Sequence, residues 1–100
     1  MSDLWEYCFI EEVLGSKDIL AIYQSPEGVK RVRYGLQKQD QAEFKQWEKN
    51  VMAIGMRGYP RDYPRMFVTE KLITHLLANG WEYYLDDTNK LRRKYQPQSG

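Results

Sequence analysis

Two side chains in this chain of 100 residues have the chemistry of a nucleophile and a base, namely Cys8 and His75. A nucleophilic thiol needs a base or a cation close enough to lower its pKa. Cys8 lies in an alternating apolar segment with no such neighbour in sequence, so we expect it to have a packing role. His75 falls about 130° from the centre of the apolar stripe of its predicted helix, which places it near solvent. We therefore expect no enzymatic activity.

Two pairs of adjacent carboxylates, Glu11-Glu12 and Asp86-Asp87, are the next candidates. Neighbouring residues of a strand point to opposite faces of the sheet, so neither pair forms an acid–base dyad by itself. The segment 86–89 lacks the central glycine and the final glutamate of a calcium loop, and we expect a hairpin turn there. One histidine and one cysteine cannot supply a structural zinc site. We expect neither a metal nor a cofactor.

Basic residues and tyrosines lie close together in the segments 30–34, 57–65 and 92–95, and this pattern favours binding. Cations beside aromatic rings suit single-stranded nucleic acid, and they are equally common at the centres of protein interfaces. A third interpretation is that these segments form a solvated strand edge and a solvated loop without a binding role. The basic and aromatic residues that we expect to carry binding are Arg31, Arg33, Arg57, Tyr59, Arg61, Tyr63 and Arg65.

The charge balance favours a protein partner over nucleic acid. The net charge is +1, whereas phosphate contacts supply most of the affinity in non-specific nucleic-acid binding. The charges are unevenly spread, because residues 1–28 carry six acids and one base and residues 29–65 carry nine bases and four acids. We expect a small adaptor that acts through protein–protein contacts, with a homodimer as one form. The alternative is a nucleic-acid-binding module that uses the loop 57–65 and the basic strands.

Met52 and Met56 fall away from the apolar stripe predicted for the first helix, which consists of Phe44, Trp47, Val51 and Ile54. Methionine adapts its shape to a partner, so these two residues are candidates for a soft contact surface. An edge of the core or a solvated surface is the competing interpretation.

Hydrophobic periodicity predicts five strands and two helices. Strands over 4–14, 19–24 and 29–36 are joined by short turns, which favours an antiparallel meander. A helix follows from the region of Asp40 to Ile54. Prolines at 60 and 64 exclude a regular helix and predict a linker with an extended or turn path over 57–65. Strands over 81–85 and 90–96 complete the chain, and the basic residues of the last one predict a position at the sheet edge.

The segment 69–85 organises this pattern. Thr69 is the expected N-cap of a helix that ends at Gly80, where a left-handed residue allows Trp81 to fold back onto Leu76. The fold class that follows is α+β. The elements follow one another along the chain in the order β-β-β-α-α-β-β, and we expect a mostly antiparallel five-stranded sheet with two helices packed on one face. We expect Trp5 and Trp81 to enter the same interior.

A single domain is expected over 1–96, with a frayed tail over 97–100. The chain has no signal peptide and no apolar run of about 18 residues, so we expect a cytoplasmic protein without membrane contacts.

The opening Trp5-Glu-Tyr7 and the later Leu-Ala-Asn-Gly-Trp-Glu-Tyr83 resemble a family of small bacterial domains of unknown function. Its members begin with a Trp-Glu-Tyr strand and end with a helix followed by Gly-Trp-Glu and an apolar strand. The resemblance covers residues 4–10 and 70–85, while the segment 25–65 has no counterpart in those shorter domains. It implies a small α+β sheet covered by a helix, and it brings no known activity.

Overall fold

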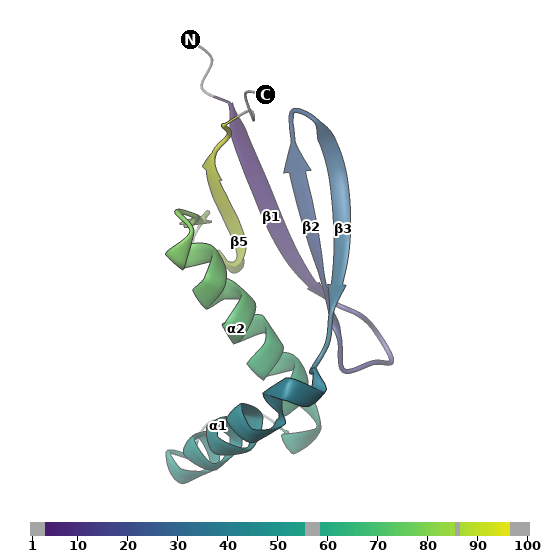
Figure 1. Ribbon diagram of the computed structural model, residues 1–100, viewed down its shortest axis with the longest axis vertical. Coiled ribbons are helices and arrows are strands. Elements are labelled where there is room, and N and C mark those ends of the chain that lie inside the picture. Colours follow the sequence, from purple (N-terminus) through teal and green to yellow (C-terminus); the bar gives the residue numbers. More distant parts are fainter. Residues whose placement is uncertain (1–3, 56–58, 86, 97–100) are drawn as a thin grey trace.

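The computed structural model describes residues 4–55, 59–85 and 87–96, and it contains an antiparallel five-stranded sheet and two helices (Figure 1). The predicted α+β class and the order β-β-β-α-α-β-β are confirmed. The elements are β1 (Trp5–Glu12), β2 (Ile19–Ser25), β3 (Gly28–Tyr34), α1 (Gln41–Ala53), α2 (Tyr63–Ala78), β4 (Glu82–Tyr84) and β5 (Asp87–Lys94), with 3-10 turns at Lys38–Asp40 and Pro60–Asp62. The spatial order of the strands is β3-β2-β1-β5-β4. No helix in the described ranges has both the length and the apolar character needed to span a membrane.

The central strand β1 determines which face of the sheet is buried. Cys8 and Ile10 point toward α2 and are buried, and Cys8 lies between Tyr23 of β2 and Leu91 of β5. These inner-face side chains are small or aliphatic at the sheet centre, so α2 can approach closely. The other core residues are Ile19, Ala21, Phe44, Val51, Tyr63, Phe67, Val68, Leu72, Leu76 and Trp81.

The two tryptophans lie on opposite faces of the sheet, so the expectation of a shared interior is wrong. Trp81 is buried on the inner face, where its ring centroid lies 6.1 Å from that of Tyr23. Trp5 points to the outer face, where the guanidinium carbon of Arg92 lies 4.0 Å from its ring centroid. The physical reason is the alternation of β1: once Cys8 faces inward, Trp5 must face outward.

Helix α2 begins earlier than predicted. Pro60–Asp62 form a 3-10 turn, in agreement with the predicted turn path, but the linker does not reach residue 65 because α2 starts at Tyr63. Pro64 fits the first helical turn, since its missing N–H would have had no partner there. Thr69 is therefore a helix-interior residue and not an N-cap, and its Oγ1 donates to the Arg65 carbonyl at 2.9 Å.

Helix α1 packs on α2 and extends beyond the end of the sheet (Figure 1). The Phe44 ring meets Phe67 edge-on at 5.4 Å, and the Trp47 indole N–H donates to Glu70 at 3.2 Å. Asp40 lies at the N-cap position, but its carboxylate accepts from Lys71 at 2.8 Å and makes no capping hydrogen bond. Ile54 is 76% exposed because α1 ends before it, so its expected core position is wrong.

Strand β5 lies between β1 and β4, so its predicted position at the sheet edge is wrong. Its basic residues are tolerated inside the sheet because cross-strand carboxylates neutralise them. Arg93 Nε lies 2.8 Å from Glu6 Oε2, and Arg92 Nε lies 3.3 Å from Glu82 Oε2. The strand begins already at Asp87, which shortens the turn predicted over 86–89.

The end of α2 matches the sequence prediction. The Trp81 amide donates to the Leu76 carbonyl at 3.1 Å, and the Gly80 amide donates to the Leu77 carbonyl at 3.3 Å. Gly80 has a φ of 90°. These two bonds and the left-handed residue define a Schellman cap, which turns the chain from α2 toward β4.

Replacing Gly80 tests how much this cap contributes to stability. A Cβ at this position would meet no atom within 4 Å, so only the left-handed backbone opposes the change. We expect Gly80→Ala to lower the free energy of unfolding by about 1–2 kcal/mol in urea denaturation. Gly80→Asn is the matched control, and its free energy of unfolding should fall by less, since asparagine tolerates the left-handed conformation. Equal stability of Gly80→Ala and the parent protein would contradict the cap.

Candidate functional site

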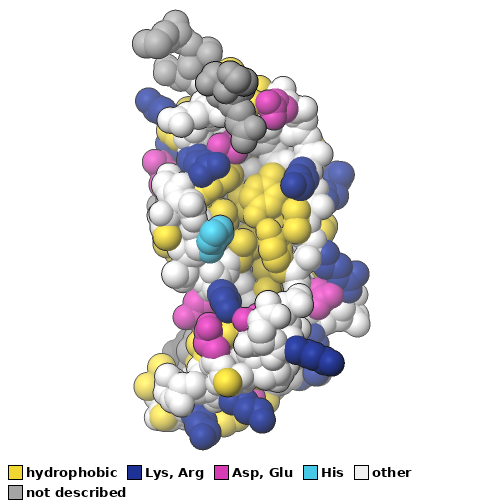
Figure 2. Space-filling view, in the orientation of Figure 1, with side chains coloured by type: hydrophobic (Ala, Val, Ile, Leu, Met, Phe, Trp, Pro, Cys, Tyr) yellow, Lys and Arg dark blue, Asp and Glu magenta, His cyan; other side chains and the backbone are white. Residues whose placement is uncertain are grey.

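Helix α2 leaves part of the inner face of the sheet without a cover. Five strands spaced about 4.8 Å apart form a sheet about 19 Å wide, whereas packed helices lie about 10 Å apart. Two helices are therefore needed to cover this face, but α1 lies beyond the end of the sheet (Figure 1). Hydrophobic side chains remain visible between α2 and β3 (Figure 2). We call this depression the α2–β3 groove.

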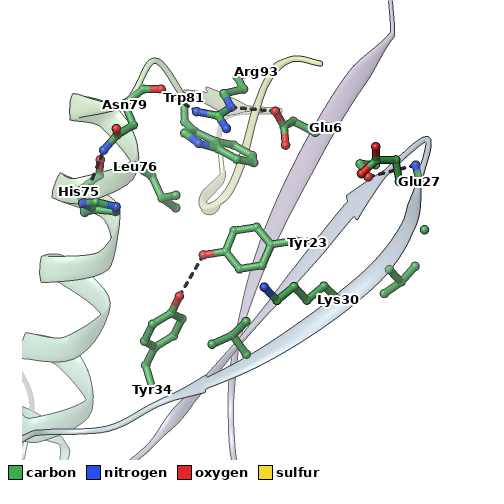
Figure 3. A pocket seen from close by; sticks show the side chains of 14 residues that line it. Glu6, Tyr23, Glu27, Lys30, Tyr34, His75, Leu76, Asn79, Trp81 and Arg93 are labelled. Atoms are coloured by element: carbon green, nitrogen blue, oxygen red, sulfur yellow. Dashed lines mark hydrogen bonds and ion pairs between the residues drawn. The ribbon is translucent and has the colours of Figure 1, made fainter. Parts of the chain in front are cut away.

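The groove has a volume of about 640 Å³ and an aromatic floor. Tyr23 of β2 and Tyr34 of β3 point toward one another across it (Figure 3). His75 and Leu76 extend from α2 on the opposite side, and Trp81 lies near the end of that helix. The remaining lining residues are Glu6, Ser25, Glu27, Gly28, Val29, Lys30, Val32, Asn79 and Arg93.

The two tyrosine hydroxyls on the floor form a hydrogen bond of 3.2 Å in which either oxygen could be the donor. Burial, followed by this bond to Tyr34, raises the pKa of Tyr23 far above its ordinary value. Tyr23 therefore stays neutral at physiological pH. Together with the Trp81 ring edge, these hydroxyls give the floor both apolar area and hydrogen-bonding capacity.

Arg93 closes the groove at the C-terminal end of α2. Its guanidinium donates to Glu6 at 2.8 Å and to the Asn79 carbonyl at 2.9 Å, and its carbon lies 4.8 Å from the Trp81 ring centroid. A cation at the last turn of a helix also interacts favourably with the helix dipole. Arg93 is thus held in place and its charge is balanced, so this end of the groove is preorganised.

The two side chains with catalytic chemistry, Cys8 and His75, share no hydrogen bond in the described part of the chain. Cys8 is fully buried beneath Tyr23, and burial raises the pKa of its thiol from 9.0 to about 11. A reactive cysteine requires the opposite shift. His75 is exposed, and Asn79 lies 3.5 Å from its Nδ1. Within the ranges that the structure describes, no group of three or more His, Cys, Asp or Glu side chains could hold a metal ion.

Two residues predicted to bind a partner make contacts within the chain. Tyr63 is buried, and its ring meets Trp47 edge-on at 5.7 Å. Arg65 donates to the Ser16 carbonyl at 3.1 Å and to Asp62 at 3.0 Å, and it lies 3.5 Å from Glu12. Arg65 thereby ties the β1–β2 loop to the start of α2.

The other predicted residues are distributed over separate surfaces. Tyr59 is 67% exposed, with the Arg61 guanidinium 5.4 Å from its ring centroid. Met52 is 54% exposed on α1. Arg31 and Arg33 lie on β3, and Arg33 Nε is 2.7 Å from Asp18. Met56 and Arg57 fall outside the described residues. The structure therefore does not assemble these candidates into one site.

Sequence reasoning did not single out the groove residues. The alternation of Ile19, Ala21 and Tyr23 places these three on one face of β2, and that signal was readable. Whether a helix covers Tyr23 depends on where α1 packs, however, and no local pattern contains that information.

Comparison of the chain with protein-family models, with curated proteins and with solved structures finds no match. The resemblance of residues 4–10 and 70–85 to small bacterial domains stays a prediction.

The burial of Cys8 predicts a slow reaction with a thiol reagent. At about pH 8 the buried thiol is protonated, so we expect native protein to react at least about 100-fold more slowly with Ellman's reagent than unfolded protein. Because the folded state keeps the proton to about pH 11, stability should fall as the pH rises above 9.0. Leu14→Cys in a Cys8→Ser background is the exposed control. If Cys8 in the native protein reacted as fast as that control, the buried position of Cys8 would be contradicted.

Proposed function

We propose that this chain is a small, non-enzymatic protein-binding module whose α2–β3 groove accepts the apolar face of a partner's helix. The observation that supports it is the uncovered inner sheet face beside α2, with Tyr23, Tyr34 and Trp81 on its floor. Tyrosine and tryptophan are common hot-spot residues in protein interfaces, because they combine large apolar area with a hydrogen-bonding group.

The shape of the groove favours a helix as its occupant. The sheet forms the floor and α2 forms one wall, so a helix lying beside α2 would complete a two-helix layer. Recognition of an amphipathic helix in an apolar groove is a recurrent binding mode. Glu6 and Glu27 balance Lys30 and Arg93 along the lining, so the charge of the groove favours no strongly charged ligand.

The floor residues are held in place before binding. Tyr23 is fixed by its hydrogen bond to Tyr34 and by its edge-to-face contact with Trp81. Ordering a flexible side chain costs about 0.5–1.5 kcal/mol on binding, and this cost is reduced where the side chain is already fixed. A rigid aromatic floor therefore supports affinity.

A second copy of this chain is a poor occupant of the groove. Helix α1 already buries Phe44 and Val51, and α2 already buries Phe67, Leu72 and Leu76. Neither helix has its main apolar stripe available for a neighbour. The proposed partner is therefore a different protein that carries an exposed amphipathic helix.

Site-specific photo-crosslinking tests the groove. A photoreactive amino acid at Lys30, on the groove rim, should crosslink a partner in the source cells, whereas the same group at the exposed Leu14 should not. Val32→Lys places a charge on the apolar floor, and we expect at least about tenfold weaker binding of the identified partner in calorimetry.

Leu14→Lys is the matched control, since it makes the same chemical change on a residue that is 92% exposed. Circular dichroism should show that both variants keep the parent fold. Equal crosslinking at the two positions, or an unchanged affinity of Val32→Lys, would reject the groove as the binding site.

A further inference from the structure

The outer face of the sheet carries a row of large apolar side chains outside the main core. Trp5, Tyr7 and Phe9 alternate along the central strand β1 and are half-buried. Within the described part of the chain, the helices pack on the opposite face and the core cluster includes none of these three residues. The other apolar outer-face residues are Leu20, Ile22 and Tyr84.

The rings on this face form a continuous surface. The Tyr7 and Phe9 rings are nearly parallel, with an interplanar angle of 4° and centroids 6.1 Å apart. The Tyr84 ring continues the row 5.3 Å from Tyr7. Arg92 joins it to Trp5, with its guanidinium carbon 4.0 Å from the Trp5 centroid and 5.1 Å from the Tyr84 centroid. Rings fixed in this way offer a platform for stacking.

Cations flank the aromatic row on both sides. The outer-face positions of the strands carry five bases and three acids, an excess of two positive charges in a chain whose net charge is +1. The bases are Arg31, Arg33, Lys90, Arg92 and Lys94, and the acids are Glu11, Glu82 and Asp87. Carboxylates pair with three of the bases, while Arg31 and Lys94 have no salt bridge among the described residues.

We infer that this outer face binds single-stranded nucleic acid, with bases stacked on the ring row and phosphates on the flanking cations. Stacking on aromatic side chains beside a positively charged track is how proteins bind single strands with little sequence preference. The near-neutral total charge conceals this surface, because the acids are concentrated elsewhere on the molecule.

A second copy packed face to face on this sheet is less compatible with the charges. Packed sheets lie about 10 Å apart, which would bring the cations that flank the aromatic row of one copy near those of the other. An anionic partner, in contrast, would be attracted by the same cations. The inference is independent of the proposed protein-binding function, since the α2–β3 groove opens on the opposite face.

Fluorescence anisotropy with labelled ten-nucleotide U and dT oligomers tests the inference on the full chain. We expect saturable binding to both oligomers at about 50 mM salt, weakened by about fivefold or more at about 200 mM, as expected for about two neutralised phosphates. Lys94→Glu should weaken binding by about tenfold. Tyr7→Thr should weaken binding to a similar extent, because it removes a ring on which a base stacks. Threonine is chosen because it is well suited to a strand.

Lys49→Glu is the matched control, because it makes the same charge change on an exposed position of α1. Its affinity should equal that of the parent protein, and circular dichroism should show that all three variants keep the fold. Three results would overturn the inference: absence of binding at low salt, binding that is insensitive to salt, or an equal loss in Lys49→Glu and Lys94→Glu. A dimer in light scattering that Tyr7→Thr dissociates, with no oligomer binding, would assign the face to a second copy instead.

Discussion

The orientation of β1 is the constraint on which the rest of the structure depends. This strand lies at the centre of the sheet and pairs on both sides, so the direction of each of its side chains determines the direction of its neighbours on β2 and β5. Cys8 is small enough to let α2 approach the middle of the sheet. A shift of one residue would bring Tyr7 and Phe9 under the helix and would send Cys8 and Ile10 to solvent.

The placement of α1 follows from a second constraint, the early start of α2. Because α2 begins at Tyr63, its first turns extend past the sheet and offer Tyr63 and Phe67 to the aromatic residues of α1. The ion pair between Lys71 and Asp40 holds the start of α1 in this position. Helix α1 therefore covers α2, and the inner face above β2 and β3 is left without the second helix that its width would accept.

Local sequence signals predicted the helices and strands well. Which face of a strand is buried, and where a helix begins, depended on long-range packing that these signals do not contain. The cap at Gly80 was readable because it depends on a few consecutive residues. The inward face of β1 was not readable from periodicity, because both of its faces are apolar: Trp5 and Tyr7 on one, Cys8 and Ile10 on the other. Pro64 was equally ambiguous, since the same residue ends one helix and begins another.

Charge counting along the chain does not locate charged surfaces, for a related reason. Arg31 and Lys94 are far apart in sequence, and the strand order brings them to the two sides of one aromatic row. Conversely, the continuous basic-aromatic segment 57–65 is divided by the fold, with Tyr63 in the core and Arg65 bound to a loop. A binding surface on a sheet consists of every second residue of several strands. Neighbouring residues such as Arg31 and Val32 therefore belong to opposite surfaces, and each serves as an internal control for the role of the other.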